Sequence, residues 1–354
     1  MENCTVGAIL SNYDISRLHH LAPVGKPRIQ VVRVDLSQLL RATSRTFALG
    51  IELLGWPLKE EVRVAYLILR VSDYLEDNRV MSPTRKVELL GLWHRILNGG
   101  AHWHELASEV GREGDPIPDL EAVRHLEQIV EGFEGLDETA RRIIVRHAGD
   151  STLGMARWVE RGPVFEDEED LDNYMHEVAG RVGYLLTDLF ANRSAAVEAQ
   201  SPFLMKAGRD FGLALQTVNV IRGLSSDRHR GWIFVPRSFI PGGVAPEALF
   251  DLSNRDAALG ALQALVAKAE RHFEGAQAYV TALPRSHARI RLFCLLPLFF
   301  GLRTLAISRL NPEVLDHEVK ITRRDVRSIV RKTSAFGMSN FWIRWYAGRL
   351  LGSS

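Results

Sequence analysis

The chain of 354 residues is 46% hydrophobic and 25% charged, which are ordinary globular values that exclude disorder as the default state. Its 44 basic residues balance 43 acidic residues, so no global positive field favours nucleic acid, and no nucleic-acid partner is expected. The two cysteines, Cys4 and Cys294, exclude a disulfide framework and a multi-cysteine zinc site.

Residues 1–34 lack helical periodicity and are expected to form an irregular N-terminal segment. They also lack the basic start and the long apolar centre of a signal peptide, so a cytoplasmic location is expected. No Pro/Gly/Ser-rich linker divides the remaining sequence. We therefore expect residues 35–354 to form one helical domain.

Helical periodicity dominates after residue 35. From Leu171 to Leu189, for example, apolar residues recur at steps of three or four, which keeps one face of a helix apolar. Prolines fall between such stretches, and strand patterns are nearly absent. The pattern predicts an all-α protein. The other expected helices cover roughly 36–55, 60–79, 84–98, 119–133, 137–160, 201–225, 255–282, 287–310 and 322–350.

The first cluster of carboxylates comprises Asp73, Glu76 and Asp77. On the expected helix they stand at positions i, i+3 and i+4, so their side chains share one face, with Tyr66 and Arg70 on nearly the same stripe. Three neighbouring acids repel one another unless a cation lies between them. Magnesium suits this position, because it takes oxygen ligands and often bridges carboxylates to substrate phosphates. A solvated acidic turn is the alternative interpretation.

A second polar face is predicted at Asn219, Gly223 and Asp227, which are spaced by four residues. Asn and Asp supply oxygen ligands for magnesium, and a glycine between them leaves room for a water. Arg228 and Arg230, which follow directly, are candidates for binding a diphosphate. In the alternative interpretation, Gly223 ends the helix and the two arginines are ordinary loop charges.

The strongest apolar run, Leu292–Leu302, is about half the ~20 residues that a membrane-spanning helix needs. We interpret it as buried core. The alternative is an apolar cavity mouth that makes peripheral contact with a membrane.

At these clusters the sequence resembles the squalene/phytoene synthase family, over a match that runs from about Ser44 to Arg349. The segment Tyr66–Asp77 is similar to the family pattern Tyr-x-x-x-Arg-x-x-Asp-x-x-Glu-Asp, and Tyr174–Gly183 is similar to its Tyr-Cys-x-x-Val-Ala-Gly-x-Val-Gly helix. The remaining similar segments are Ser44–Phe47, which looks like the opening Ser-x-Ser-Phe, and Leu283–Pro284, Arg291–Cys294, Pro297, Thr304–Leu305 and Val319–Ile321, which look more like squalene synthases than phytoene synthases.

The resemblance implies an isoprenoid-synthase fold, a single helical bundle around a central cavity, with two acidic motifs facing each other across it. It also implies Mg²⁺ as cofactor and an allylic prenyl diphosphate as substrate, whose C–O bond breaks to give a cation sheltered by apolar walls. The residues implied are Asp73, Asp77 and Tyr174 as catalytic residues, Asp73, Glu76, Asp77, Asn219 and Asp227 as metal ligands, and Ser44, Arg45, Tyr66, Arg70, Gln216, Arg222, Arg228 and Arg230 as the diphosphate-binding residues.

The sequence departs from the family at the second motif. The family has Asn-x-x-Arg-Asp-x-x-Glu-Asp, whereas Gly223 and Ser226 replace its first two acids here. Two prenyl diphosphates carry a large negative charge that several metal ions and carboxylates must seat, so a site without two acids suits one diphosphate better. We therefore predict a prenyltransferase that ionises one donor, such as farnesyl diphosphate, and delivers the prenyl cation to a small, plausibly aromatic acceptor.

Three other functions stay open. Head-to-head coupling of two farnesyl diphosphates to presqualene diphosphate and squalene, with NADPH as reductant, is favoured by Phe293, Cys294 and the Val319–Ile321 segment. A terpene cyclase is suggested because Asn219, Gly223 and Asp227 look like the metal-binding triad of terpene synthases. A non-catalytic assembly factor with this fold is disfavoured by the intact first motif.

Overall fold

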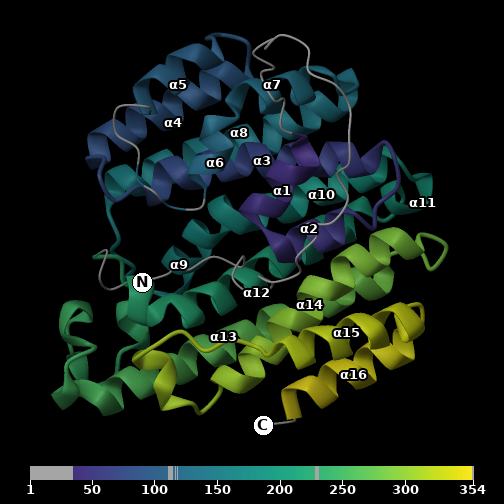
Figure 1. The fold of residues 1–354 in the computed structure, drawn as a ribbon. Coiled ribbons are helices and arrows are strands. Elements are labelled where there is room, and N and C mark those ends of the chain that lie inside the picture. The colour runs from purple at the N-terminus through teal and green to yellow at the C-terminus, as the bar shows by residue number, and fades with distance from the viewer. Residues whose placement is uncertain (1–34, 111–114, 116, 118, 228–230, 353–354) are drawn as a thin grey trace, which may run out of the picture.

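The computed structural model describes residues 35–110, 115, 117, 119–227 and 231–352. Within that part every regular element is a helix and no strand occurs, which confirms the all-α prediction (Figure 1). The predicted irregular segment 1–34 lies outside the described residues. The α-helices are α1 (Leu36–Thr43), α2 (Arg45–Ile51), α3 (Leu58–Asp77), α4 (Pro83–Leu97), α5 (Trp103–Val110), α6 (Leu120–Arg124), α7 (Leu126–Glu134), α8 (Glu138–Arg161), α9 (Glu168–Met175), α10 (Arg181–Asn192), α11 (Ala195–Glu198), α12 (Ser201–Asp227), α13 (Arg255–Ala282), α14 (Ala288–Ser308), α15 (Arg323–Phe336) and α16 (Asn340–Gly352).

Two groups of helices enclose a middle layer. In Figure 1 the helices α3 to α8 lie above and α13 to α16 lie below, with α9, α10 and α12 between them. The long helix α12 packs against α10, α13 and α14, and α8 packs against α3, α4 and α10. A continuous cluster of buried apolar side chains connects both groups. The middle layer therefore holds α12 at a fixed distance from α3.

Several helices that the periodicity predicted as continuous are interrupted. Ser44 adopts an extended backbone (φ −158°, ψ 119°) and its hydroxyl accepts a hydrogen bond from the Phe47 amide at 3.2 Å, so it ends α1 and caps α2. A second break at His125 separates α6 from α7, and residues 337–339 separate α15 from α16. The single helices expected over 36–55, 119–133 and 322–350 are therefore wrong. The hydroxyls of Ser44 and Ser339 cap the helices after the first and third breaks, whereas no side-chain cap hydrogen bond forms at His125.

The helix predicted from Leu171 to Leu189 contains a π-helical turn, η1 (His176–Gly180), between α9 and α10. This region packs backbone to backbone against α12. A Cβ atom at Gly183 would lie 2.0 Å from the Gly208 carbonyl oxygen, and one at Gly212 would lie 2.3 Å from the Ala179 carbonyl oxygen. Only glycine allows this approach, so the two positions fix how closely α10 and α12 meet.

The apolar run Leu292–Leu302 lies in the core, as predicted. It belongs to α14, which by length and composition alone could cross a membrane, but 78% of its most apolar window is buried inside the protein. Pro297 lies within this helix without ending it. Since α14 packs on α2, α12, α13, α15 and α16, it behaves as a core helix. This burial favours the core interpretation of the run over the alternative of a cavity mouth.

Candidate functional site

A cavity of about 200 Å³ lies between α3 and α12, and it gathers most of the predicted site residues. Arg228 and Arg230 lie outside the described residues, and Arg45 begins α2 with a side chain that is likewise not described. The roles of all these residues stay predictions. The predicted residues that line the cavity are Ser44, Tyr66, Arg70, Asp73, Glu76, Asp77, Tyr174, Gln216, Asn219, Arg222 and Asp227.

The first acidic motif lies on the last turns of α3, and Arg70 organises it. The Arg70 guanidinium donates to Asp73 Oδ2 at 2.8 Å from Nη1 and to Asp119 Oδ1 at 2.7 Å from Nε. Asp119 lies just before α6, and its side chain is only 3% exposed. Arg70 is therefore held between two carboxylates. Sequence reasoning missed Asp119, because no local pattern connects it to a residue 49 positions earlier.

Burial of this motif changes how it binds protons. Burial, together with the negative charges of Asp119 and Asp77, raises the pKa of Asp73 to about 7, although Arg70 opposes the shift. Burial and the neighbouring Asp77 and Asp73 raise the pKa of Glu76 to about 8. A cation that binds between these carboxylates would release the protons and remove the repulsion. The donor set therefore fits a hard divalent cation such as Mg²⁺.

The second motif lies wholly on α12, which continues to Asp227. The alternative in which Gly223 ends the helix is therefore wrong. The Asn219 amide donates to Gln216 Oε1 at 3.3 Å, and Asp227 is buried at the cavity wall. The two oxygen-bearing side chains, Asn219 and Asp227, thus stand on the side of the cavity opposite α3.

Arg222, the arginine of this motif, donates to the carboxylate of Glu318. Glu318 in turn lies 2.7 Å from the ammonium of Lys320. Glu318 is 96 residues from Arg222, and the sequence analysis did not select it. Its only sequence signal is its place directly before the squalene synthase-like segment Val319–Ile321.

An aromatic wall surrounds Tyr174, which is 5% exposed. Its hydroxyl donates to Glu76 Oε1 at 3.3 Å, so it connects α9 to the first motif. Its ring stacks on Phe234 with centroids 5.1 Å apart, and Trp158 meets it edge to face at 5.6 Å. Phe234 and Trp232 follow the second motif in the sequence but were not predicted as site residues.

A second cavity of about 410 Å³ adjoins the first. Both are lined by Glu76, Asp77, Tyr174 and Phe234, and Trp232 lines only the larger one. The first motif therefore stands where the two cavities meet, and both are lined by charged and aromatic side chains.

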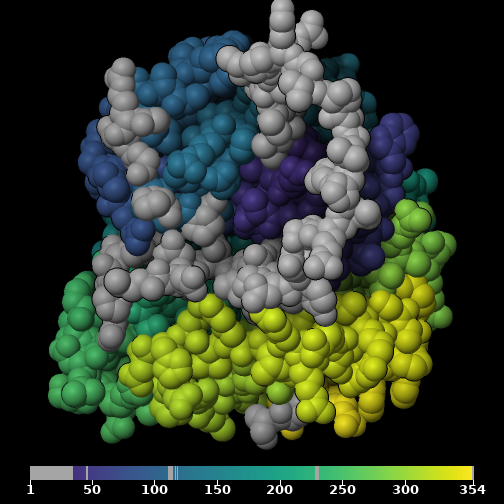
Figure 2. Space-filling model, viewed as in Figure 1, coloured from purple at the N-terminus to yellow at the C-terminus, as the bar shows by residue number. Residues whose placement is uncertain are grey.

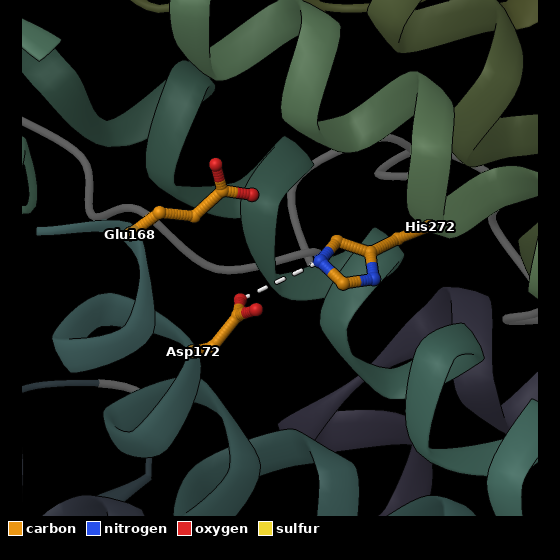
Figure 3. A group of neighbouring side chains, drawn as sticks. All are labelled: Glu168, Asp172 and His272. Atoms are coloured by element: carbon orange, nitrogen blue, oxygen red, sulfur yellow. Dashed lines mark ion pairs between the residues drawn. The ribbon is translucent and has the colours of Figure 1, made fainter.

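Another group of potential metal ligands lies outside both cavities: Glu168 and Asp172 on α9 and His272 on α13 (Figure 3). Their ligand atoms lie within 4.8 Å of one another. However, the fully buried ammonium of Lys268 bonds to Asp172, lies 3.0 Å from His272 Nε2 and lies 3.7 Å from Glu168. A lysine thus already supplies the positive charge, so we interpret the group as an ion-pair cluster that connects α9 to α13. Asp172 lies two residues before Tyr174.

Lys268→Met should lower the free energy of unfolding by about 3 kcal/mol, because Asp172 loses the cation that compensates its partial burial. Urea unfolding followed by circular dichroism measures this change. The exposed Lys206→Met, on α12, is the matched control and should stay within about 0.5 kcal/mol of wild type. Equal urea midpoints for Lys268→Met and Lys206→Met would contradict a stabilising ion-pair cluster.

Without metal, the folded protein should lose stability as pH rises from about 4 to 8. In this window the folded state holds protons on Asp73 and Glu76 that the unfolded chain has released, so raising the pH favours unfolding. Asp73→Asn should flatten this dependence and raise the melting temperature at pH 8. Thermal unfolding in EDTA tests this, with the exposed Asp256→Asn as control. A steeper loss of stability in Asp73→Asn than in wild type would contradict the assignment.

Comparison with known proteins identifies the family. The squalene/phytoene synthase profile matches residues 40–325. The squalene synthase of Schizosaccharomyces pombe is 28% identical over 318 residues, which cover 87% of this chain and 66% of that protein. The human squalene synthase is 29% identical over 290 residues, covering 80% of this chain and 65% of that protein. The chain thus spans just under two thirds of the length of these relatives.

Solved structures show the same fold. The structure of TcSQS with the ligand BPH1237 aligns with a TM-score of 0.76 at 22% identity over 90% of each chain. Squalene synthase HpnC from Alicyclobacillus acidocaldarius aligns with a TM-score of 0.54 at 20% identity, over 78% of this chain and 92% of that one. With the matched profile and the helical architecture, these results show that the chain belongs to the squalene/phytoene synthase family of prenyl-transferring enzymes and has the isoprenoid-synthase fold.

Proposed function

We propose that this chain is a Mg²⁺-dependent prenyltransferase that ionises one allylic prenyl diphosphate, such as farnesyl diphosphate, and transfers the prenyl cation to a small acceptor, releasing diphosphate. One observation carries the proposal: the two faces of the cavity are unequal. The α3 face keeps three acids, Asp73, Glu76 and Asp77, whereas Gly223 and Ser226 leave the α12 face with one acid, Asp227.

The oxygen ligands fit magnesium and would be supplied by both faces. Asp73, Glu76 and Asp77 would hold the ion from α3, and Asn219 and Asp227 would hold it from α12. When bound, Mg²⁺ supplies positive charge that stabilises the leaving diphosphate. Burial is the largest cause of the raised pKa values of Asp73 and Glu76, and the charges of the neighbouring acids add to it, so a bound cation would offset both effects.

The arginines of the cavity also support a single donor. Among the described residues, Arg70 is shared between Asp73 and Asp119, and Arg222 is paired with Glu318. A diphosphate must therefore compete with carboxylates for either guanidinium. Two diphosphates, each with a charge near −3, would need more positive charge than these pairs leave available.

The aromatic wall suits two further requirements of the reaction, which are to stabilise the prenyl cation and to bind the acceptor. The faces of Tyr174, Phe234 and Trp232 can stabilise an allylic cation and exclude water from it. The same faces, in the cavity of about 410 Å³, offer stacking for a flat aromatic acceptor. The hydroxyl of Tyr174 holds Glu76 in place at the boundary of the two spaces. These features favour an aromatic acceptor beside the ionisation site.

Head-to-head synthesis of squalene with NADPH is the second candidate. It is favoured by the squalene synthases among the relatives and by Phe293 and Cys294, which are buried in α14. It requires two donors in the same site. A terpene cyclase would need the same ionisation and no acceptor, and an assembly factor would have no need of the intact first motif.

Asp73→Asn and Asp77→Asn should each reduce Mg²⁺-dependent release of pyrophosphate from farnesyl diphosphate by about a hundredfold or more, because both acids are proposed to seat the ion. Circular dichroism should show an unchanged helix content. Asp256→Asn, on the exposed side of α13, serves as the control. Near-normal release by both variants would reject the metal assignment.

Wild type incubated with farnesyl diphosphate, Mg²⁺ and NADPH should make little presqualene diphosphate or squalene, since its second motif lacks two acids. Gly223→Asp with Ser226→Glu restores those acids and should increase head-to-head product. The matched control is Gly223→Asn with Ser226→Gln, which adds nearly the same volume without charge. Chromatography of the extracted products provides the measurement. Efficient squalene formation by wild type would reject the single-donor proposal in favour of the second candidate.

A further inference from the structure

The C-terminal pair of helices, α15 and α16, has a charge unlike the rest of the chain. Residues 322–354 contain seven basic residues and one acidic residue, although the whole chain has a net charge of only +1. The single acid, Asp325, is already engaged, because its carboxylate accepts hydrogen bonds from the amide and the hydroxyl of Thr322 and from Arg303 at 3.1 Å. The basic residues are Arg323, Arg324, Arg327, Arg331, Lys332, Arg344 and Arg349.

The same pair of helices also exposes large aromatic side chains. Phe341 is 80% exposed, and Phe336 and Trp345 are 55% and 50% exposed. Phe341 and Trp345 stand at i and i+4, so they share one face of α16, and the Arg349 guanidinium lies 5.6 Å from the Trp345 ring centroid. We call Phe336, Phe341, Trp345 and the six exposed arginines of these helices the basic-aromatic face. The Lys332 ammonium instead lies 5.2 Å from the ring centroid of the buried Tyr346.

The rest of the fold keeps this face outward. The other side of α16, with Ile343, Tyr346 and Leu350, is buried, and α16 packs on α14. In Figure 1, α15 and α16 lie at the lower edge of the molecule, and Figure 2 shows their yellow atoms on its surface. Since α14 separates them from α12, a partner can cover this face without entering the cavity.

We propose that the basic-aromatic face docks the protein peripherally on a bilayer that contains anionic phospholipid. Lysine and arginine are attracted to the negative surface of such a bilayer, and tryptophan and phenylalanine insert at the level of its head groups. Contact is peripheral because α14, the described helix apolar enough to span, is buried. A second copy of the chain fits this face poorly in a symmetric pair, since the six arginines would meet the same six arginines.

Co-sedimentation of the full chain with vesicles tests the proposal. Wild type should bind vesicles of phosphatidylcholine with about 30% phosphatidylglycerol, and bind neutral phosphatidylcholine vesicles much more weakly. Raising the salt from about 0.1 to 0.5 M should release it. Phe341→Ser with Trp345→Ser, and separately Arg323→Gln with Arg324→Gln and Arg327→Gln, should each weaken binding about tenfold or more.

Two controls place the effect on this face. Leu252→Ser changes a side chain that is 90% exposed, and Arg142→Gln removes an arginine whose side chain is 69% exposed, both away from α15 and α16. Both should bind vesicles like wild type. Circular dichroism should confirm that all variants keep their helix content.

Three outcomes would overturn the proposal. Wild type would fail to bind anionic vesicles, or both sets of variants would bind like wild type. In the third, wild type would not bind vesicles but would self-associate or bind single-stranded nucleic acid, and Phe341→Ser with Trp345→Ser would abolish that binding. This result would assign the face to another partner. None of these measurements depends on catalysis, so they stand apart from the proposed function.

Discussion

Repulsion among buried carboxylates is the constraint on which the site depends. Asp73, Glu76 and Asp77 lie within two turns of α3, and burial makes their charges harder to screen than they would be in water. Arg70 relieves part of the repulsion, but it also brings Asp119 to the cavity. Without metal, the raised pKa values of Asp73 and Glu76 favour protonated carboxyl groups, and a divalent cation has to displace these protons to bind.

The rest of the fold fixes the opposite wall. Glycine contacts between η1, α10 and α12 set a short backbone separation, and the Lys268–Asp172 pair ties α9 to α13. Tyr174 lies between these two constraints and reaches Glu76 through its hydroxyl. A tyrosine held from both sides positions an aromatic face beside the acids with little freedom to move, which is what preorganised stabilisation of a cation requires.

The second motif explains why family membership leaves the reaction open. The proposed prenyl ionisation would use metal ligands on both walls, and Asn219 and Asp227 line the cavity opposite α3. The number of diphosphates depends on the further charge available, and here Gly223 and Ser226 remove acids while Glu318 engages Arg222. The solved structures similar to this chain share its fold. The proposed difference in chemistry therefore rests on a few residues of α12 and the segment before α15.

The sequence by itself determined the helical class, the family and the shared faces of both motifs. Positions i, i+3 and i+4 of one helix are neighbours whatever surrounds them, so Asp73, Glu76 and Asp77 could be placed together before any tertiary contact was known. Only the tertiary structure decided that Asp119 meets Arg70, that Glu318 meets Arg222, and that Phe234 stacks on Tyr174. These partners come from distant segments, and their approach depends on how whole helices pack, which local periodicity does not encode. The break at Ser44 escaped prediction for a related reason: a cap is decided by an individual hydrogen bond that an apolar stripe does not reveal.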